Sequence, residues 1–185
     1  MQSITLLMTE YQSLDDAALV DCARDNADAF AALYYRYLTP IYRYLYHRVG
    51  NEKDAEDLTA QVFLEVVEGL NNYQERGRFA SWLFTIARHR LIDLYRQRTP
   101  EPLNDSPDNT IDLHDALEKC ESQEYLTNLL TELDEDQLEL LRLRFSADLK
   151  FPEIASVLGQ SIGAVKMRLY RTLDWLRVMW EDHYE

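Results

Sequence analysis

One stretch of this chain, residues 76–98, combines an apolar helix face with a second face that is cationic and aromatic, and that combination limits the folds open to the whole sequence. At about 3.6 residues per turn, one apolar stripe is formed by Phe79, Trp82, Leu83, Ile86, Ala87 and Leu94. A second face is formed by Phe84, Arg88, Leu91 and Tyr95. The stretch holds six arginines and one aspartate, a formal charge of +5 in a chain whose net charge is −14. Such a helix packs on a core through its first stripe and has a cationic, aromatic face left over.

That second face has two interpretations. Rings beside guanidinium groups are what single-stranded nucleic acid requires, because every base offers a π face and every linkage a negative charge. Alternatively, both faces are buried between neighbouring helices, and the arginines extend their charged ends to water. The stretch alone is compatible with both.

The composition favours an all-α protein, and because the sequence has no metal cluster or phosphate loop we expect no cofactor. Only five glycines and five prolines occur among 185 residues, which favours helices over sheets. Cys22 and Cys120 lie far apart without a CxxC motif, so we expect free thiols and no metal site. Residues 1–13 lack a basic n-region and a long apolar run, so we expect a cytoplasmic protein with no membrane insertion. A net charge of −14 repels DNA, so DNA contacts would require local basic patches and a cationic partner.

Residues 14–98 predict a first helical domain. Helical spacing runs through residues 14–49, with Asp28 as the expected N-cap of the second part of this run. Pro40 predicts a kink or a break, because proline fits poorly inside a helix. Gly50 is the expected left-handed end.

The next predicted helix, residues 54–70, divides into an apolar side and an acidic side. The apolar side consists of Ala55, Leu58, Val62, Val66 and Leu70. The acidic side consists of Asp54, Asp57, Gln61, Glu65 and Glu68. Acids in the first turn suit the helix dipole, but the last two lie too far along the helix for that explanation. A solvated face and a docking face for a basic partner both fit this pattern.

Residues 99–125 predict an acidic linker between two domains. Three prolines occur early in the segment, and residues 99–131 contain eight acids and one lysine. A solvated spacer would have the same composition, so the charge of this segment says little about function.

Residues 126–180 predict a second helical domain with a helix-turn-helix. Pro152 begins a short helix, Gly159 permits a tight turn, and Ser161 caps a second helix. The expected inward positions of that second helix are Ile162, Val165, Leu169, Leu173 and Leu176. Its expected outward or flanking positions are Ala164, Lys166, Met167, Arg168, Tyr170 and Arg171. Small residues followed by cations suit a helix that enters the major groove, and an ordinary helical hairpin is the alternative.

Taken together, these segments resemble a sigma factor of the extracytoplasmic-function (ECF) group, the small two-domain initiation subunits of bacterial RNA polymerase. The matching segments are FAALYYRYLTPIYRYL, DAEDLTAQVFLEV, FASWLFTIARHRLIDLYRQR and PEIASVLGQSIGAVKMRLYRTLDWLR. Their joint order and spacing are more specific than any single motif. The resemblance implies a sigma region 2 helical bundle and a sigma region 4 helix-turn-helix, with the chemistry left to the polymerase and no enzymatic activity in this chain.

The resemblance also implies three binding surfaces. Core RNA polymerase would dock on Asp54, Asp57, Gln61, Glu65 and Glu68. The loop at residues 72–78 would trap a base extruded from the minus-ten promoter element. The strand of that element would be held by Arg76, Arg78, Phe84, Arg88, Leu91, Tyr95 and Arg96. The minus-thirty-five element would be read by Ser161, Gly163, Ala164, Lys166, Met167, Arg168 and Arg171. By the same resemblance, an anti-sigma factor is a further expected partner.

The chain departs from the family pattern at two places. His89 stands where the family usually has an asparagine after the IAR motif, so no base contact at position 89 carries over from the family. Met167 and Tyr170 are unusual on the recognition helix, so the promoter sequence that relatives prefer does not carry over either.

Two other functions fit parts of the chain. A sigma-like decoy that only binds an anti-sigma protein has no use for arginines on both DNA surfaces, and a stand-alone helix-turn-helix regulator leaves the first domain unexplained.

Overall fold

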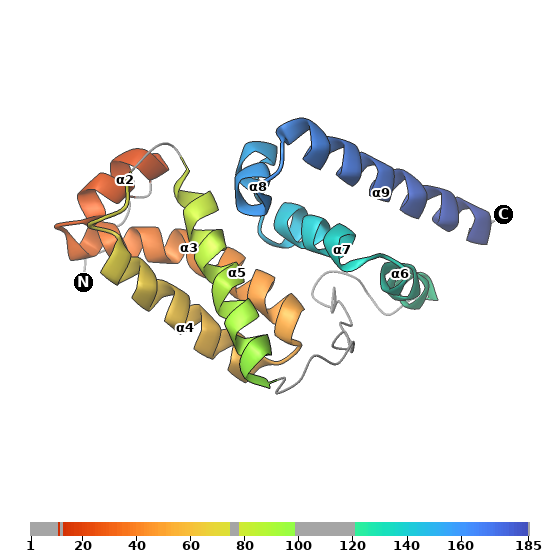
Figure 1. Ribbon diagram of the computed structural model, residues 1–185, viewed down its shortest axis with the longest axis horizontal. Coiled ribbons are helices and arrows are strands. Elements are labelled where there is room, and N and C mark those ends of the chain that lie inside the picture. The colour runs from red at the N-terminus through yellow and green to blue at the C-terminus, as the bar shows by residue number, and fades with distance from the viewer. Residues whose placement is uncertain (1–10, 12, 75–77, 99–120, 185) are drawn as a thin grey trace.

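All regular structure in the described part of the chain is helical, as the sequence predicts. The computed structural model describes residues 11, 13–74, 78–98 and 121–184. A first helical unit is formed by α2 (Asp16–Ala23), α3 (Ala27–Val49), α4 (Glu52–Gly69) and α5 (Phe79–Arg98). A second helical unit is formed by α6 (Glu121–Thr131), α7 (Glu135–Leu141), a π-helical turn η1 (Arg142–Ser146), α8 (Phe151–Leu158) and α9 (Ile162–Tyr184). Figure 1 shows the two units side by side, with α9 extending away from the first.

A polar N-cap and a C-terminal glycine define the two ends of α3 in the first unit. Asn26 caps α3, because its side chain accepts hydrogen bonds from the backbone N–H groups of Asp28 and Ala29 at 2.8 and 3.1 Å. The predicted cap, Asp28, is therefore wrong by two residues and lies in the first turn, where an acid suits the helix dipole. The end of α3 at Gly50 is confirmed, since this residue has a φ of 69°.

Helix α3 continues through Pro40, so of the kink or break predicted there, the break is wrong. A proline in a helix interior costs about 3 kcal/mol through its lost hydrogen bond and its ring clash. Both sides of Pro40 carry fully or almost fully buried side chains, Tyr37 before it and Ile41, Tyr44 and Leu45 after it. Burial of one such side chain contributes about 1.5 to 3 kcal/mol, so the packed face offsets the proline.

The apolar ladder of α4 and the first stripe of α5 form the core of this unit, as predicted. The five ladder residues from Ala55 to Leu70 are all buried. On α5, Phe79, Leu83, Ile86 and Ala87 are buried, while Trp82 and Leu94 are partly buried and packed against the same core.

In the second unit, the helix-turn-helix consists of α8, Gly159 and α9. Gly159 has a φ of 64° and ends α8, and the Ser161 hydroxyl accepts a hydrogen bond from the Ala164 N–H at 3.2 Å. Val165 and Leu169 are buried, but Ile162 is 44% exposed, so its predicted inward position is wrong. Ile162 is the first residue of α9, and the buried positions of this helix begin about one turn later, at Val165.

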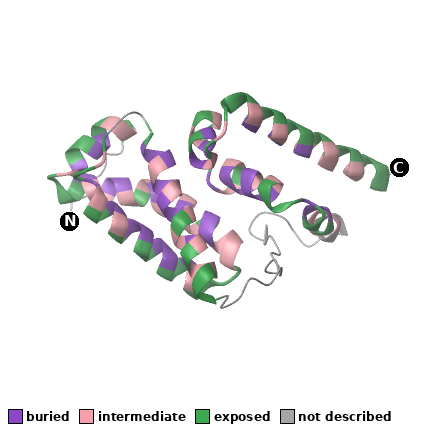
Figure 2. Ribbon diagram, in the orientation of Figure 1, coloured by how far each residue is buried: buried purple, intermediate pink, exposed green. Residues whose placement is uncertain are grey.

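The buried apolar cluster runs from α2 through α5 and continues without interruption into η1, α8 and α9. A separate small cluster joins α6, α7 and the middle of α9 through Leu130, Leu133 and Leu138. In Figure 2 the buried residues of both units lie on the sides that face their neighbours, and exposed residues follow the outer side of α9. Helix α6 begins at Glu121, inside the predicted linker, while most of that linker, Arg76 and Cys120 lie outside the described residues. Within the described segments, no helix has the length and apolarity needed to cross a bilayer.

Candidate nucleic-acid interface

A pocket of about 420 Å³ lies at the beginning of α5. Its lining consists of Tyr73, Gln74, Arg78, Ser81, Trp82, Thr85 and Ser156. The rings of Tyr73 and Trp82 stack with centroids 4.6 Å apart and planes inclined by 28°, and Phe79 packs against both. Flat rings, small hydroxyl side chains and an exposed arginine are the groups that a single unstacked base would need for stacking, hydrogen bonding and charge pairing.

The loop that carries Tyr73 is held from behind by Arg24. The Arg24 guanidinium donates hydrogen bonds to the backbone carbonyls of Leu70 at 2.9 Å, Asn71 at 3.0 Å and Tyr73 at 2.6 Å. Charge-assisted bonds are shorter and stronger than neutral ones, so this one side chain positions the loop beside the pocket. Sequence reasoning missed Arg24, because a lone arginine at the end of a helix gives no signal for a partner 46 to 49 residues away.

The structure divides the predicted minus-ten residues into accessible and buried groups. Arg78 and Arg96 are exposed, Arg88 and Tyr95 are half-buried, and Arg76 lies outside the described residues. Phe84 and Leu91 are 0% and 1% exposed, so the prediction that they contact a strand is wrong for this arrangement. The physical reason is packing: the Phe84 ring meets Tyr44 of α3 edge to face, with centroids 5.5 Å apart. The Tyr95 hydroxyl donates to the Arg48 carbonyl at 2.5 Å, which fixes its ring at the end of α3.

An ion cluster lies where α3 and α5 meet α7 and η1. We call it the inter-unit ion cluster, and its members are Tyr44, Arg48, Arg88, Glu135, Glu139 and Arg142. The buried carboxylate of Glu139 accepts from the Tyr44 hydroxyl at 2.7 Å and pairs with Arg48 at 3.2 Å and Arg88 at 3.8 Å. Glu135 pairs with Arg142 at 2.9 Å and contacts Arg48.

Burial changes the proton affinities inside this cluster. Desolvation, followed by the nearby Glu139 carboxylate, raises the pKa of the Tyr44 hydroxyl well above its usual 10. Desolvation and the neighbouring Arg48 charge lower the pKa of Arg142 to about 10. Both groups therefore keep their ordinary protonation state at neutral pH, with Tyr44 as a neutral donor and Arg142 as a cation.

The acidic side of α4 is partly paired with α5. Asp54 meets Arg98 and Glu65 meets Arg90, each at 2.6 Å, while Asp57, Gln61 and Glu68 are exposed. The hydrogen bond from Arg98, with a second from Asn51, lowers the pKa of Asp54 below its usual 3.8.

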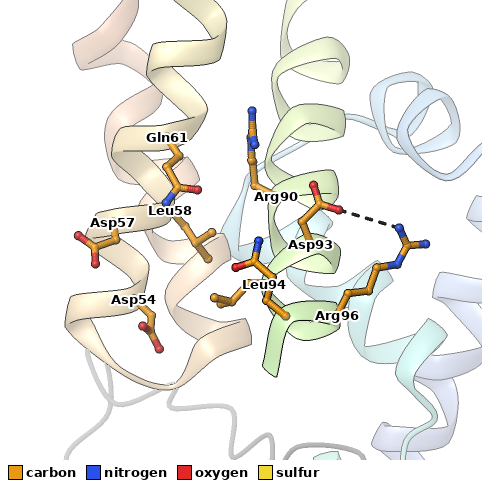
Figure 3. Close-up of a pocket in the computed structure, with 9 residues that line it drawn as sticks. Asp54, Asp57, Leu58, Gln61, Arg90, Asp93, Leu94 and Arg96 are labelled. Atoms are coloured by element: carbon orange, nitrogen blue, oxygen red, sulfur yellow. Dashed lines mark ion pairs between the residues drawn. The ribbon is translucent and has the colours of Figure 1, made fainter. Parts of the chain in front are cut away.

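A cleft of about 350 Å³ separates the two helices there. Figure 3 shows Asp54, Asp57 and Gln61 of α4 on one side of this cleft, and Arg90, Asp93 and Arg96 of α5 on the other. The exposed acids that remain on α4 form a negative surface that suits a basic protein partner.

The recognition helix presents most of its predicted DNA residues to solvent. Ser161, Gly163, Lys166, Met167 and Arg171 are exposed, and Ala164 and Arg168 are half-buried. Arg168 is engaged within the protein, since it donates to Gln160 at 3.2 Å and pairs with Asp136 at 3.2 Å. An open groove of about 920 Å³ lies on the same face of α9, and its lining includes Tyr170, Leu173, Asp174 and Arg177 besides the predicted residues. Arg177 was not predicted as a DNA contact because it lies beyond the expected contact segment.

Two family models match the chain. Sigma-70 region 2 matches residues 33–101, and Sigma-70, region 4 matches residues 123–176. The ECF RNA polymerase sigma factor BldN of Streptomyces coelicolor is 33% identical over 164 residues, covering 85% of this chain and 62% of BldN. The ECF RNA polymerase sigma factor RpoE of Cereibacter sphaeroides is 32% identical over 169 residues, covering 88% of this chain and 93% of that protein.

Among solved structures, the sigma factor RpoE in complex with the anti-sigma factor NepR from Bartonella quintana is similar in fold. Its TM-score is 0.60 at 19% identity, covering 82% of this chain and 96% of that chain. At this identity the likeness concerns the arrangement of helices alone. The chain therefore has the matched sequence regions and a helical arrangement found in a solved sigma factor.

Proposed function

This chain belongs to the ECF sigma factors, and from that premise we propose that it is a transcription initiation subunit that directs core RNA polymerase to promoters and helps to open them. The observation that carries the proposal is that one chain has two different surfaces whose chemistry suits nucleic acid. One is the base-sized aromatic pocket at the beginning of α5, and the other is the basic, solvent-facing side of α9. A regulator that reads only duplex DNA would need the second surface and not the first.

At the minus-ten element, the pocket receives one extruded base. Removing a base from the stack costs a few kcal/mol, and stacking on an aromatic ring returns about 1 to 3 kcal/mol. The Tyr73 and Trp82 rings and the hydroxyls of Ser81 and Thr85 supply these contacts, while Arg78 pairs with the adjoining phosphate. Arg88 and Arg96 continue the cationic track along α5.

At the minus-thirty-five element, α9 enters the major groove of duplex DNA with its N-terminal half. Gly163 allows the helix backbone to approach the bases closely, and Lys166 and Arg171 reach guanine edges or phosphates. Met167 and Tyr170 offer apolar contact to thymine methyl groups. Arg168 contributes to DNA only after it leaves Gln160 and Asp136.

Core polymerase docks on the acidic side of α4, through Asp57, Gln61 and Glu68 together with the partly paired Asp54 and Glu65. A subunit with a net charge of −14 binds DNA poorly by itself, because only local cation clusters release counterions from DNA. Contact with a basic polymerase surface offsets part of the negative field and directs α5 to the strand. The polymerase performs the chemistry, and the site of action is the cytoplasm. An anti-sigma factor is the proposed negative regulator.

Run-off transcription on a genomic fragment library tests this function. We expect core polymerase with this chain to start at sites that core polymerase alone ignores. The Lys166→Ala/Arg171→Ala variant, which changes only exposed residues of α9, should lose most of these starts while it still co-elutes with core polymerase. An unchanged set of starts with and without the chain would refute the proposed function.

A further inference from the structure

Two large apolar side chains are exposed on the face of α9 that is proposed to enter the major groove. Met167 is 52% exposed and Tyr170 is 59% exposed. Both belong to the lining of the open groove of about 920 Å³, which also includes Gly163, Lys166 and Arg171. The groove therefore combines apolar side chains with cations, whereas hydrogen bonding to bases and phosphates would need polar groups alone.

The Tyr170 ring is held from one side by Phe151 of α8. The centroids of the two rings are 6.2 Å apart and their planes are inclined by 57°. The Lys166 ammonium lies 5.4 Å from the centroid of the same Phe151 ring, within the range of a cation–π contact. Lys166 and Tyr170, four residues apart on α9, are therefore both supported by one residue of the preceding helix. Because such side chains have less freedom left to lose, binding to them has a lower entropic cost.

Met167 lies on the neighbouring row of the same helix face. Met167 and Arg171 are four residues apart, as Lys166 and Tyr170 are, so each row pairs one apolar side chain with one cation. A methionine has no hydrogen-bond donor, and its thioether is a weak acceptor. Met167 therefore cannot distinguish bases by their donors and acceptors, and apolar contact is the way in which it can select a base.

Thymine is the base that presents an apolar group in the major groove. Its C5 methyl group lies there, and apolar side chains contact it. Met167 and Tyr170 are three residues apart, which corresponds to about 4.5 Å along a helix that rises about 1.5 Å per residue. Successive base pairs of duplex DNA are about 3.4 Å apart. The two side chains can therefore reach methyl groups on neighbouring base pairs.

We propose that Met167 and Tyr170 make recognition of the minus-thirty-five element depend on the C5 methyl groups of thymines at two neighbouring base pairs. This inference rests on the proposed function, in which α9 reads that element. Each methyl group is a small apolar group that is buried on binding, so its loss should weaken binding by about fourfold, and the loss of both by about 15-fold. Lys166 and Arg171 bind phosphates or guanine edges, so their contacts do not depend on these methyl groups.

The dependence on methyl groups is first measured with two random-sequence pools of duplex DNA. One pool contains thymine, and the other contains deoxyuridine in its place, which lacks only the methyl group. Core polymerase with the full-length chain selects sequences from each pool, and the sequences that core polymerase alone selects are subtracted. We expect enrichment of thymine at two neighbouring base pairs in the first pool, and no preference for uracil at these positions in the second.

The selected duplex is then synthesised with thymine or uracil at each of the two positions, and its Kd is measured by fluorescence anisotropy. For the wild type, the Kd should rise by about fourfold with each uracil. Met167→Gln keeps the length of the side chain but replaces the thioether with a polar amide, so it should abolish the rise at one position alone. Tyr170→Ala should abolish the rise at the other position, whereas Tyr170→Phe keeps the ring and should respond as the wild type does.

Val178→Gln is the matched control, because Val178 is an exposed apolar residue of α9 that lies outside the lining of the groove. This variant should respond to uracil as the wild type does. An equal response of the wild type, Met167→Gln and Tyr170→Ala would assign the effect to the DNA itself and overturn the inference. The absence of an enriched pair of thymines would overturn it as well.

Run-off transcription separates this inference from the proposed function. New start sites without a response to the methyl groups would overturn the inference and leave the function standing. A methyl response that requires Met167 and Tyr170, without any new start site, would refute the function and leave the contact between α9 and thymine standing. The loss of both results would refute both.

Discussion

Arg24→Ala should impair promoter opening although Arg24 does not itself line the base pocket and lies outside α9. Three carbonyl groups of the loop before the base pocket depend on this one guanidinium. Hydrogen bonds to charged groups contribute about 1.5 to 3 kcal/mol each when buried. The Arg24 side chain is 24% exposed and its contact with Asn71 is exposed, so water replaces part of the loss. We therefore expect the ordered loop to lose about 3 kcal/mol in total, which corresponds to about 100-fold in its population.

The assay is permanganate footprinting of unpaired thymines in complexes with core polymerase and promoter DNA. Opening should fall by about tenfold to 100-fold in Arg24→Ala, while co-elution with core polymerase persists because α4 is unchanged. Arg24→Lys keeps the positive charge, but its single ammonium group cannot donate to three separate carbonyls as the guanidinium does, so promoter opening by this variant should be intermediate. Arg43→Ala, at an exposed position of α3, is the matched control and should open normally. Wild-type opening in Arg24→Ala would show that the loop is positioned without this residue, and the reasoning would be wrong.

Two further predictions concern single contacts of the fold. Arg98→Ala should return the pKa of Asp54 toward its usual 3.8, because the hydrogen bond from Arg98 is the largest cause of the lowered pKa. Titration of the Asp54 carboxyl by NMR measures this change. An unmoved pKa would mean that the hydrogen bond from Asn51 lowers it instead. The lowered folded-state pKa stabilises the fold above pH 3.8, so this small, surface-screened contribution is lost as the pH falls below that value. Gly159→Ala should lower the free energy of unfolding by about 1 to 2 kcal/mol, because a side chain at a φ of 64° is strained although no atom lies within 4 Å of the added Cβ. Thermal unfolding measures it, with a fall in Tm of about 2 to 4 °C for each kcal/mol, and an unchanged Tm would mean that the turn relaxes at no cost.

Several parts of the fold could be read from local pattern. The ladder of α4 was predicted residue by residue, since each apolar position recurs every three or four residues and its burial follows from helical geometry. The turn at Gly159 and the cap at Ser161 were predicted because each depends on backbone conformation or on one hydrogen bond within three residues. Of the kink or break predicted at Pro40, the break was wrong because a local penalty was outweighed by burial on both sides of Pro40 along α3.

Whether the second face of α5 is buried or exposed could not be predicted from the local pattern of residues. Its residues share a stripe, yet Phe84 and Leu91 are buried while Arg88 and Tyr95 reach the edge of the packed region. A periodic pattern gives the direction of a side chain on its own helix, but it does not state where a neighbouring helix ends. The pocket depends on the same information, since Tyr73, Trp82 and Ser156 come from three separate segments.

The sequence by itself therefore determined the helical class, the two sets of matched segments, the acidic side of α4 and the helix-turn-helix. These features depend on contacts within a turn or two of helix, which the order of residues specifies directly. Tertiary structure alone decided that Arg24 holds the loop, that Glu139 pairs with Arg48 and Arg88, and that α8 lies against the pocket. Each of these contacts joins residues tens of positions apart. Their energies come from desolvation and charge pairing between packed helices, and that packing is absent from any local pattern.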